Sequence, residues 1–120
     1  MPGFGRVKRI SKSFLFVGAG QLVSAASVME GEIYQIHLRV PNFINAVTAT
    51  LTLEDEDGYE VYNSGAKNRN TNTNIYPNPP QLLAGTFAMK VTLSGAHGGI
   101  ADPASADATV VAVIHYRGPY

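Results

Sequence analysis

A regular alternation of apolar and polar side chains surrounds a tight turn near the middle of the chain. In residues 46–54, apolar residues occupy every second position and three threonines lie between them. A period of two is typical of a β-strand with one buried face. The Asp-Gly step at positions 57 and 58 provides a tight reversal, and residues 59–62 provide a returning strand. This pattern predicts an antiparallel hairpin.

Similar patterns extend along the rest of the chain and predict a β-sandwich. The six expected strands span residues 6–17, 32–40, 46–54, 59–62, 85–94 and 106–117. Residues 21–29 are a weaker candidate because Ser and Ala dilute the apolar residues, and residues 30–31 are typical of a short turn. We find no helical periodicity of useful length and no long repeat. About seven short strands predict one domain, residues 1–120, folded as an all-β, antiparallel, Ig-like or jelly-roll-like sandwich.

The last predicted strand is apolar on both faces, because Val110, Ala112 and Ile114 alternate with Val111 and Val113. Such a strand lies in the centre of a sandwich or is buried against another subunit. For residues 32–40, the alternation predicts an apolar face formed by Tyr34, Ile36, Leu38 and Val40. We expect a core that contains Leu51, Leu53, Phe87, Met89, Val91, Leu93, Val110, Ala112 and Ile114.

Three stretches lack a strand pattern. Residues 1–5 contain one proline and two glycines and are expected to form a flexible terminal arm. Residues 63–84 are rich in Asn and Pro and are predicted to form a long loop. Within that loop, residues 71–76 are a candidate edge strand or an arm that reaches a neighbour. Residues 95–105 are predicted to form a second long loop.

The net charge of zero conceals an uneven distribution of charge. Four of the nine basic residues precede the first acid, Glu30, and seven of the nine acids lie in residues 30–60. The four basic residues are Arg6, Lys8, Arg9 and Lys12. Such a segment binds an acidic partner surface, or it is an ordinary solvated strand face. Nucleic acid is not an expected partner, because the chain is not basic overall and no aromatic stacking platform flanks the cluster.

No motif predicts catalysis, metal binding or cofactor binding. Cys is absent, which excludes disulfides and thiolate metal sites. His37, His97 and His115 lack partners at metal-ligand spacing and are expected on strand faces or loops. The acidic residues 54–57 lack the ligand pattern of a calcium loop and are expected to form a solvated hairpin tip. The apolar part of residues 13–20 is too short for a signal peptide or a membrane span. We therefore expect neither an enzyme, nor a cofactor, nor a membrane partner.

Three segments resemble small β-sandwich structural proteins of tailed bacteriophage virions. They are residues 49–65, with the run TLEDEDGYEVYNSG, residues 83–99, and the C-terminal run TVVAVIHY. The resemblance covers residues 46–116 and implies a non-enzymatic virion component. A capsid decoration (cement) protein is the first expectation, and a neck, collar or tail component is the alternative. The implied partners are the major capsid protein or another virion protein and copies of the chain itself, as a homo-oligomer such as a trimer. The implied location is the virion, assembled in the host cytoplasm.

Attachment is predicted to use the four basic residues, with acidic patches such as residues 54–57 of a neighbouring copy as their target. Val111, Val113 and Tyr120 are expected to supply apolar contacts. Residues 1–12 are expected to be separable from the fold. A carbohydrate- or cell-surface-binding module remains the alternative from a different class, since six Tyr residues offer stacking surfaces although Trp is absent. A secreted adhesin-like domain is less favoured because no signal sequence is recognised.

Overall fold

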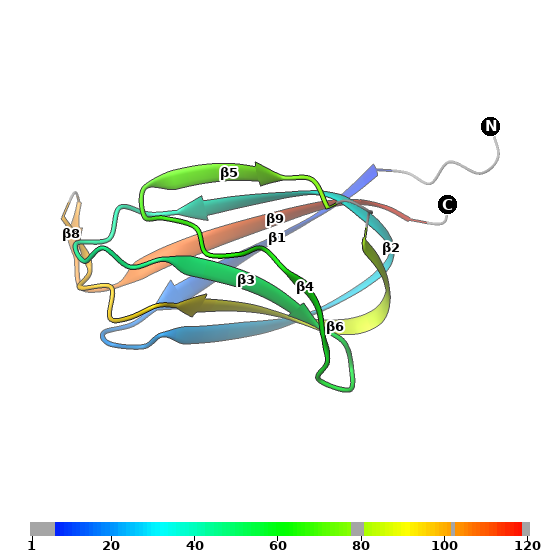
Figure 1. Ribbon diagram of the computed structural model, residues 1–120, viewed down its shortest axis with the longest axis horizontal. Coiled ribbons are helices and arrows are strands. Elements are labelled where there is room, and N and C mark those ends of the chain that lie inside the picture. Colours follow the sequence, from blue (N-terminus) through cyan, green and yellow to red (C-terminus); the bar gives the residue numbers. More distant parts are fainter. Residues whose placement is uncertain (1–6, 78–80, 102, 119–120) are drawn as a thin grey trace.

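The structure is a computed structural model, and it describes residues 7–77, 81–101 and 103–118 of the 120-residue chain. The described residues form strands and turns, with no helix among them (Figure 1). The strands are β1 (Val7–Phe16), β2 (Leu22–Val40), β3 (Ala49–Glu54), β4 (Glu60–Asn63), β5 (Thr71–Ile75), β6 (Gln81–Leu93), β7 (Ile100–Ala101), β8 (Ala104–Ser105) and β9 (Ala108–Arg117).

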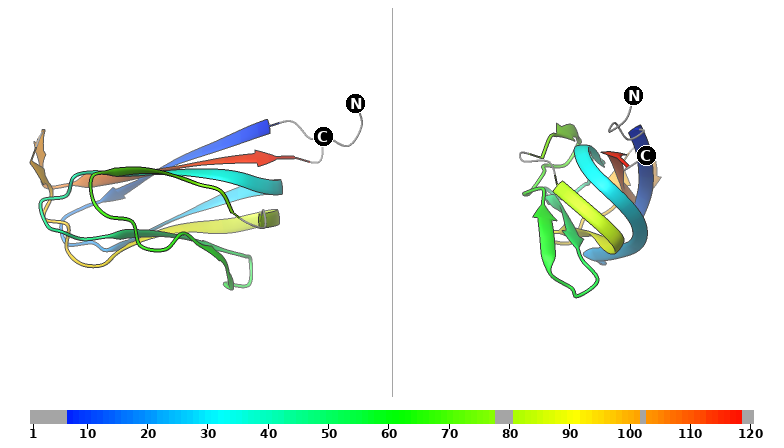
Figure 2. Two further views of the ribbon diagram at one scale, coloured as in Figure 1. Left: turned by 45° about the horizontal axis from the view of Figure 1, so that its top comes forward. Right: turned by 90° about the vertical axis from the view of Figure 1, so that its right-hand side faces the viewer.

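The longest strand, β2, belongs to both layers of the fold. Its residues 22–33 pair with β6, and its residues 32–39 pair with β9. Because residues 32 and 33 have partners on both strands, β6 and β9 lie on opposite edges of β2. The strand therefore leaves one layer and enters the other near Gly31, where the right-hand view of Figure 2 shows it curving around the molecule.

This crossing divides the strands into two layers. The first layer consists of β4, β3, β6 and the first half of β2. The second layer consists of β1, β9, the second half of β2, and β5, which pairs with residues 36–40. All of these pairings are antiparallel, and β7 and β8 form a small separate hairpin. The predicted all-β antiparallel sandwich is confirmed.

Gly31 allows the chain to cross between layers without a turn. Its φ is 152°, and a Cβ at this position would collide with the carbonyl oxygen of Arg117 at the end of β9. The turn predicted at residues 30–31 is wrong. The chain stays extended there, and Glu30 and Gly31 continue the ladder with β6.

The core lies between the two layers and contains every residue predicted for it. Each of the nine predicted residues is at most 2% exposed. The prediction lacked several others that are equally buried, above all Phe14 and Phe16 of β1, Ile33 of β2 and Phe43. The predicted strand at residues 6–17 thus supplies two large core side chains, although its first half is basic.

A bulge in β2 changes the predicted facing of Tyr34. The register against β9 shifts between Ile33 and Gln35, so Tyr34 is the extra residue. Its ring centroid lies 6.3 Å from that of His115, and the guanidinium carbon of Arg117 lies 5.6 Å from the ring centroid. Ile33 therefore faces the core in place of Tyr34. The other predicted residues of this face are buried: Ile36, Leu38 and Val40.

Both predicted loops contain strands. Residues 63–84 include β5 and the start of β6, which corrects the long-loop prediction and confirms the candidate edge strand to within one residue. Residues 95–105 include the hairpin of β7 and β8. The predicted flexible arm, residues 1–5, lies outside the described residues.

Candidate functional site

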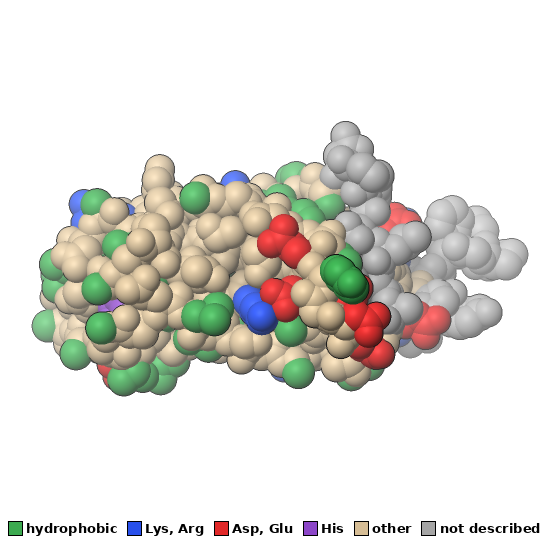
Figure 3. Space-filling view, turned by 60° about the horizontal axis from the view of Figure 1, so that its bottom comes forward, with side chains coloured by type: hydrophobic (Ala, Val, Ile, Leu, Met, Phe, Trp, Pro, Cys, Tyr) green, Lys and Arg blue, Asp and Glu red, His purple; other side chains and the backbone are tan. Residues whose placement is uncertain are grey.

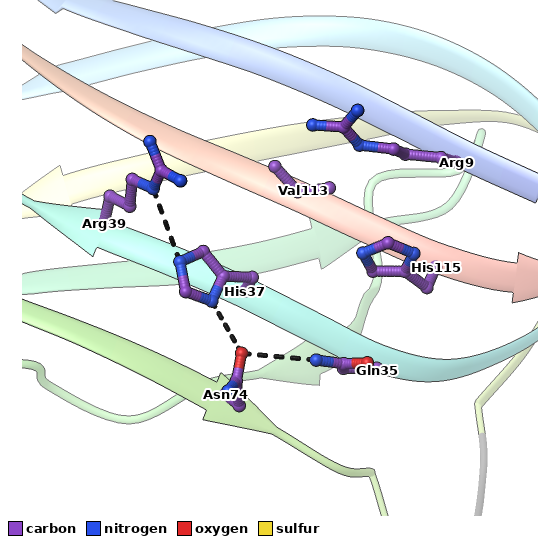
Figure 4. A pocket seen from close by; sticks show the side chains of 7 residues that line it. All are labelled: Arg9, Gln35, His37, Arg39, Asn74, Val113 and His115. Atoms are coloured by element: carbon purple, nitrogen blue, oxygen red, sulfur yellow. Dashed lines mark hydrogen bonds between the residues drawn. The ribbon is translucent and has the colours of Figure 1, made fainter.

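A shallow hollow of about 320 Å³ lies on the outer face of the second layer (Figure 4). Side chains from four neighbouring strands, β1, β9, β2 and β5, surround it. They are Arg9, Gln35, His37, Arg39, Asn74, Val113 and His115. We call this the basic hollow.

Strand register brings these distant residues together. Arg9 lies opposite His115 in the pairing of β1 with β9. His37 lies opposite Val113 of β9 on one side and opposite Asn74 of β5 on the other. Directly opposed side chains on one face of an antiparallel pair are in contact range. The hollow is therefore a product of the sheet, formed from segments far apart in the sequence.

Hydrogen bonds hold the His37 side of the hollow in place. Asn74 Oδ1 lies 2.6 Å from His37 Nδ1 and accepts a hydrogen bond of 3.2 Å from Gln35 Nε2. Since this oxygen can only accept, His37 Nδ1 is the donor of that pair. His37 Nε2 then accepts from Arg39 Nε at 3.4 Å, as the dashed lines in Figure 4 show.

No carboxylate in the described part of the chain neutralises the charge of the hollow. Its lining contains two guanidinium groups, from Arg9 and Arg39, and no carboxylate. The ion pair that the described residues form joins Lys90 Nζ to Glu54 Oε1 at 2.9 Å, and it lies on the first layer. Arg9 and Arg39 are both exposed. An uncompensated pair of guanidiniums next to hydrogen-bonding amides suits an anionic group, since guanidinium binds carboxylates through two parallel hydrogen bonds.

The predicted basic segment is divided between two faces of β1. Arg9 faces outward and joins the hollow, whereas Lys8 and Lys12 share the strand face of Phe14 and Phe16. Lys12 is half-buried. An inward-facing charge on an edge strand discourages pairing with other chains. Arg6 and Tyr120, also predicted as attachment residues, lie outside the described residues.

Residues 7–12 are part of the sheet. They pair with residues 112–117 of β9 without a break, which corrects the expectation that residues 1–12 are separable from the fold. Val113 is 6% exposed and forms the floor of the hollow, and Val111 is half-buried. Of the two alternatives predicted for the strand with two apolar faces, the structure has the central strand, since β1 and β2 flank β9. Its outward valines leave little free apolar surface.

The acidic residues of the β3–β4 turn form an ordered tip. Asp55 Oδ1 accepts hydrogen bonds of 3.0 Å from the backbone N–H groups of Asp57 and Tyr59. Glu56 Oε1 accepts one of 3.2 Å from the N–H of Thr86 on β6. Figure 3 shows acidic side chains gathered toward the end of the molecule that carries this turn. On β4, burial raises the pKa of the Tyr62 phenol. We call residues 54–60 the acidic tip.

His97 is fully buried and belongs to the core. Its ring centroid lies 5.7 Å from that of Phe43 and 6.5 Å from that of Phe16. Its Nδ1 accepts a hydrogen bond of 2.8 Å from the N–H of Gly99, while Nε2 has no hydrogen-bond partner among the described residues. The sequence pattern placed His97 in a loop and gave no sign of its burial. The glycines that surround it, at positions 95, 98 and 99, were the only signal.

The described part of the chain contains neither a metal-binding cluster nor a membrane-spanning helix. No group of three or more His, Cys, Asp and Glu side chains there is placed to hold a metal ion. No helix in that part is long and apolar enough to cross a membrane.

The sequence matches no protein-family model and no curated protein. Among solved structures, the VP2 subviral particle of infectious bursal disease virus is similar, with 15% identity, a TM-score of 0.43, and coverage of 94% of this chain and 33% of that chain. The mitogen of Yersinia pseudotuberculosis has 7% identity, a TM-score of 0.41, and coverage of 97% and 89%. The chain spans about a third of the virus protein. Similarities this weak do not decide between functions.

Proposed function

We propose that the chain is a non-enzymatic structural component of a virus particle, and that it decorates the shell by binding the main shell protein and copies of itself. The observation that carries the proposal is that one chain has a basic hollow, which has no carboxylate partner in residues 7–77, 81–101 and 103–118, and a separate, ordered acidic tip. The sequence resemblance to small β-sandwich proteins of tailed bacteriophages supports the same proposed function.

The hollow and the tip are suited to contacts between different copies. The hollow lies on the outer face of the second layer, whereas the tip joins β3 and β4 of the first layer. A contact between two different patches is head-to-tail and forms closed rings, such as trimers, or open chains. Exposed ion pairs contribute only about 0–1 kcal/mol each, so stable attachment requires many copies that act together on a lattice.

A recognition module is the second candidate function, and the hollow itself is the observation that favours it. Its volume of about 320 Å³ is at the lower end of the range typical of ligand pockets. Arginines beside amides would suit a carboxylated or sulfated sugar. Binding of such a sugar with no binding to particles would favour this module over a decoration protein. Electron microscopy of labelled particles would distinguish the head from the neck and tail.

We predict that Arg9→Glu combined with Arg39→Glu lowers binding to particles that lack the chain about three- to tenfold in low salt, because two docking charges are reversed. Co-sedimentation measures the bound fraction. Wild-type binding should itself weaken as salt is raised, since the Debye length falls.

The control separates docking from folding. Both arginines are exposed, so the denaturation midpoint of the double variant should change little. If the target of the hollow is the acidic tip of a neighbouring copy, a second variant with Asp57→Lys and Glu60→Lys should associate with the arginine variant when the two proteins are mixed. If the arginine variant binds to particles as fully as the wild-type chain, the proposed role of the hollow is contradicted.

A further inference from the structure

One side of the sandwich has a long run of unpaired backbone. Residues 22–30 of β2 pair with β6 on one edge. On the opposite edge, β9 pairs only with residues 32–39. In residues 7–77, 81–101 and 103–118, no strand pairs with residues 22–30 on this second edge. We call it the free β2 edge. Its backbone N–H and C=O groups are able to pair with another extended strand.

The free β2 edge lacks the features that normally prevent strand pairing. Residues 22–29 contain no charged residue and no proline, and their centre is Ser24-Ala25-Ala26-Ser27. By contrast, β1, which is also an edge strand, has Lys8, Arg9 and Lys12 along its length. Charges and prolines are the usual protection of sheet edges. Two β1 edges would repel each other, whereas two free β2 edges would not.

The outward side chains of this edge are self-complementary. Leu22 is 57% exposed and Val28 is 69% exposed, and both face away from the core. If two copies pair antiparallel about a twofold axis at Ala25, Leu22 of each copy lies opposite Val28 of the other. Ser24 then lies opposite Ala26, and these small side chains allow close approach. Each exposed apolar residue is covered by the other, which removes apolar surface from water.

We propose that a second copy of this chain binds the free β2 edge, with Ala25 opposite Ala25 across a twofold axis. The two first layers then form one continuous sheet. This contact goes beyond the decoration role and does not depend on it. It consists of backbone hydrogen bonds and apolar side chains, so it persists at salt concentrations that weaken docking through the basic hollow.

A cysteine scan tests the axis, because the chain has no native Cys. Ala25→Cys should give a disulfide-linked dimer under mild oxidation, since the Cα atoms of directly opposed residues lie about 4.5–5.5 Å apart, which is within the span of a disulfide. Val23→Cys, on the same strand face, is the matched control. Its two thiols would be separated by four residues along the strand, about 13 Å, which is too far for a disulfide. Cross-linking at position 23 but not at position 25 would overturn the proposed register.

Charge substitutions test the side-chain pairing by sedimentation equilibrium. The double substitution Leu22→Lys with Val28→Lys places two positive charges opposite each other in both of the pairs formed by positions 22 and 28 across the twofold axis. It should raise the dimer Kd about tenfold or more. Leu22→Glu with Val28→Lys places opposite charges there and should restore much of the affinity. Thr92→Lys with Thr86→Lys, on the adjacent strand β6, is the control and should leave the dimer intact. A wild-type chain that remains monomeric, or a dimer indifferent to the lysine pair, would overturn the proposal.

Discussion

Replacing Gly31 with alanine is expected to destabilise the protein by about 2–6 kcal/mol. The residue has a φ of 152°, and an added Cβ would meet the backbone carbonyl oxygen of Arg117. Both β2 and β9 are held by neighbouring strands at this point, so neither can move aside freely. The loss is a large fraction of the stability of a small domain and is measured by urea denaturation.

Gly58→Ala is the matched control for this effect. Gly58 also has a positive φ, 84°, but a Cβ there meets nothing within 4 Å. Its replacement should cost only about 1–2 kcal/mol, the strain of the backbone conformation alone. Equal losses for the two variants would mean that the collision with Arg117 is relieved and that the crossing of β2 does not depend on glycine.

Truncation of Phe87 to alanine is expected to cost about 3–5 kcal/mol, and truncation of Leu51 about 2–5 kcal/mol. Phe87 of β6 is 2% exposed and Leu51 of β3 is 0% exposed, so both variants leave cavities between the layers. Close-packed cores relax only partly around such cavities. The midpoint of chemical denaturation should fall for both variants.

Thr92→Ala provides the comparison on the same strand as Phe87. Thr92 faces outward and is exposed, so its truncation removes no core contact and should cost no more than about 1 kcal/mol. An unchanged midpoint for Phe87→Ala or for Leu51→Ala would show that the facing of the corresponding strand is wrong.

Period-two patterning was sufficient to predict the strands that have one clearly apolar face. The alternation of β3, β6 and β9 predicted nine core residues correctly, because each strand has one face toward the opposite layer. The hairpin between β3 and β4 followed from its Asp-Gly step. These features depend on local sequence, which a pattern of neighbouring residues can report.

Features that depend on long-range pairing were not predictable in the same way. Glu30-Gly31 has the composition of a turn, but the ladder with β6 keeps the chain extended there. Tyr34 is out of phase because of a bulge against β9, which the sequence does not mark. The basic hollow combines Arg9 with side chains of β2, β5 and β9, so only the register of four strands reveals it. Of the predicted attachment residues, Arg9 and Val113 line the hollow.

The pairing of β1 with β9 has a consequence for synthesis on the ribosome. β1 pairs along its whole length with β9, which is translated after all the other described strands, from Val7 opposite Arg117 to Phe16 opposite Ala108. At about 5–20 residues per second, translation separates the two strands by roughly 5–20 seconds. During this interval Phe14 and Phe16 have no β9 to pack beside, and the lysines and arginine of the same segment keep it soluble. The basic residues of β1 thus protect a nascent strand before they take part in any contact of the folded protein.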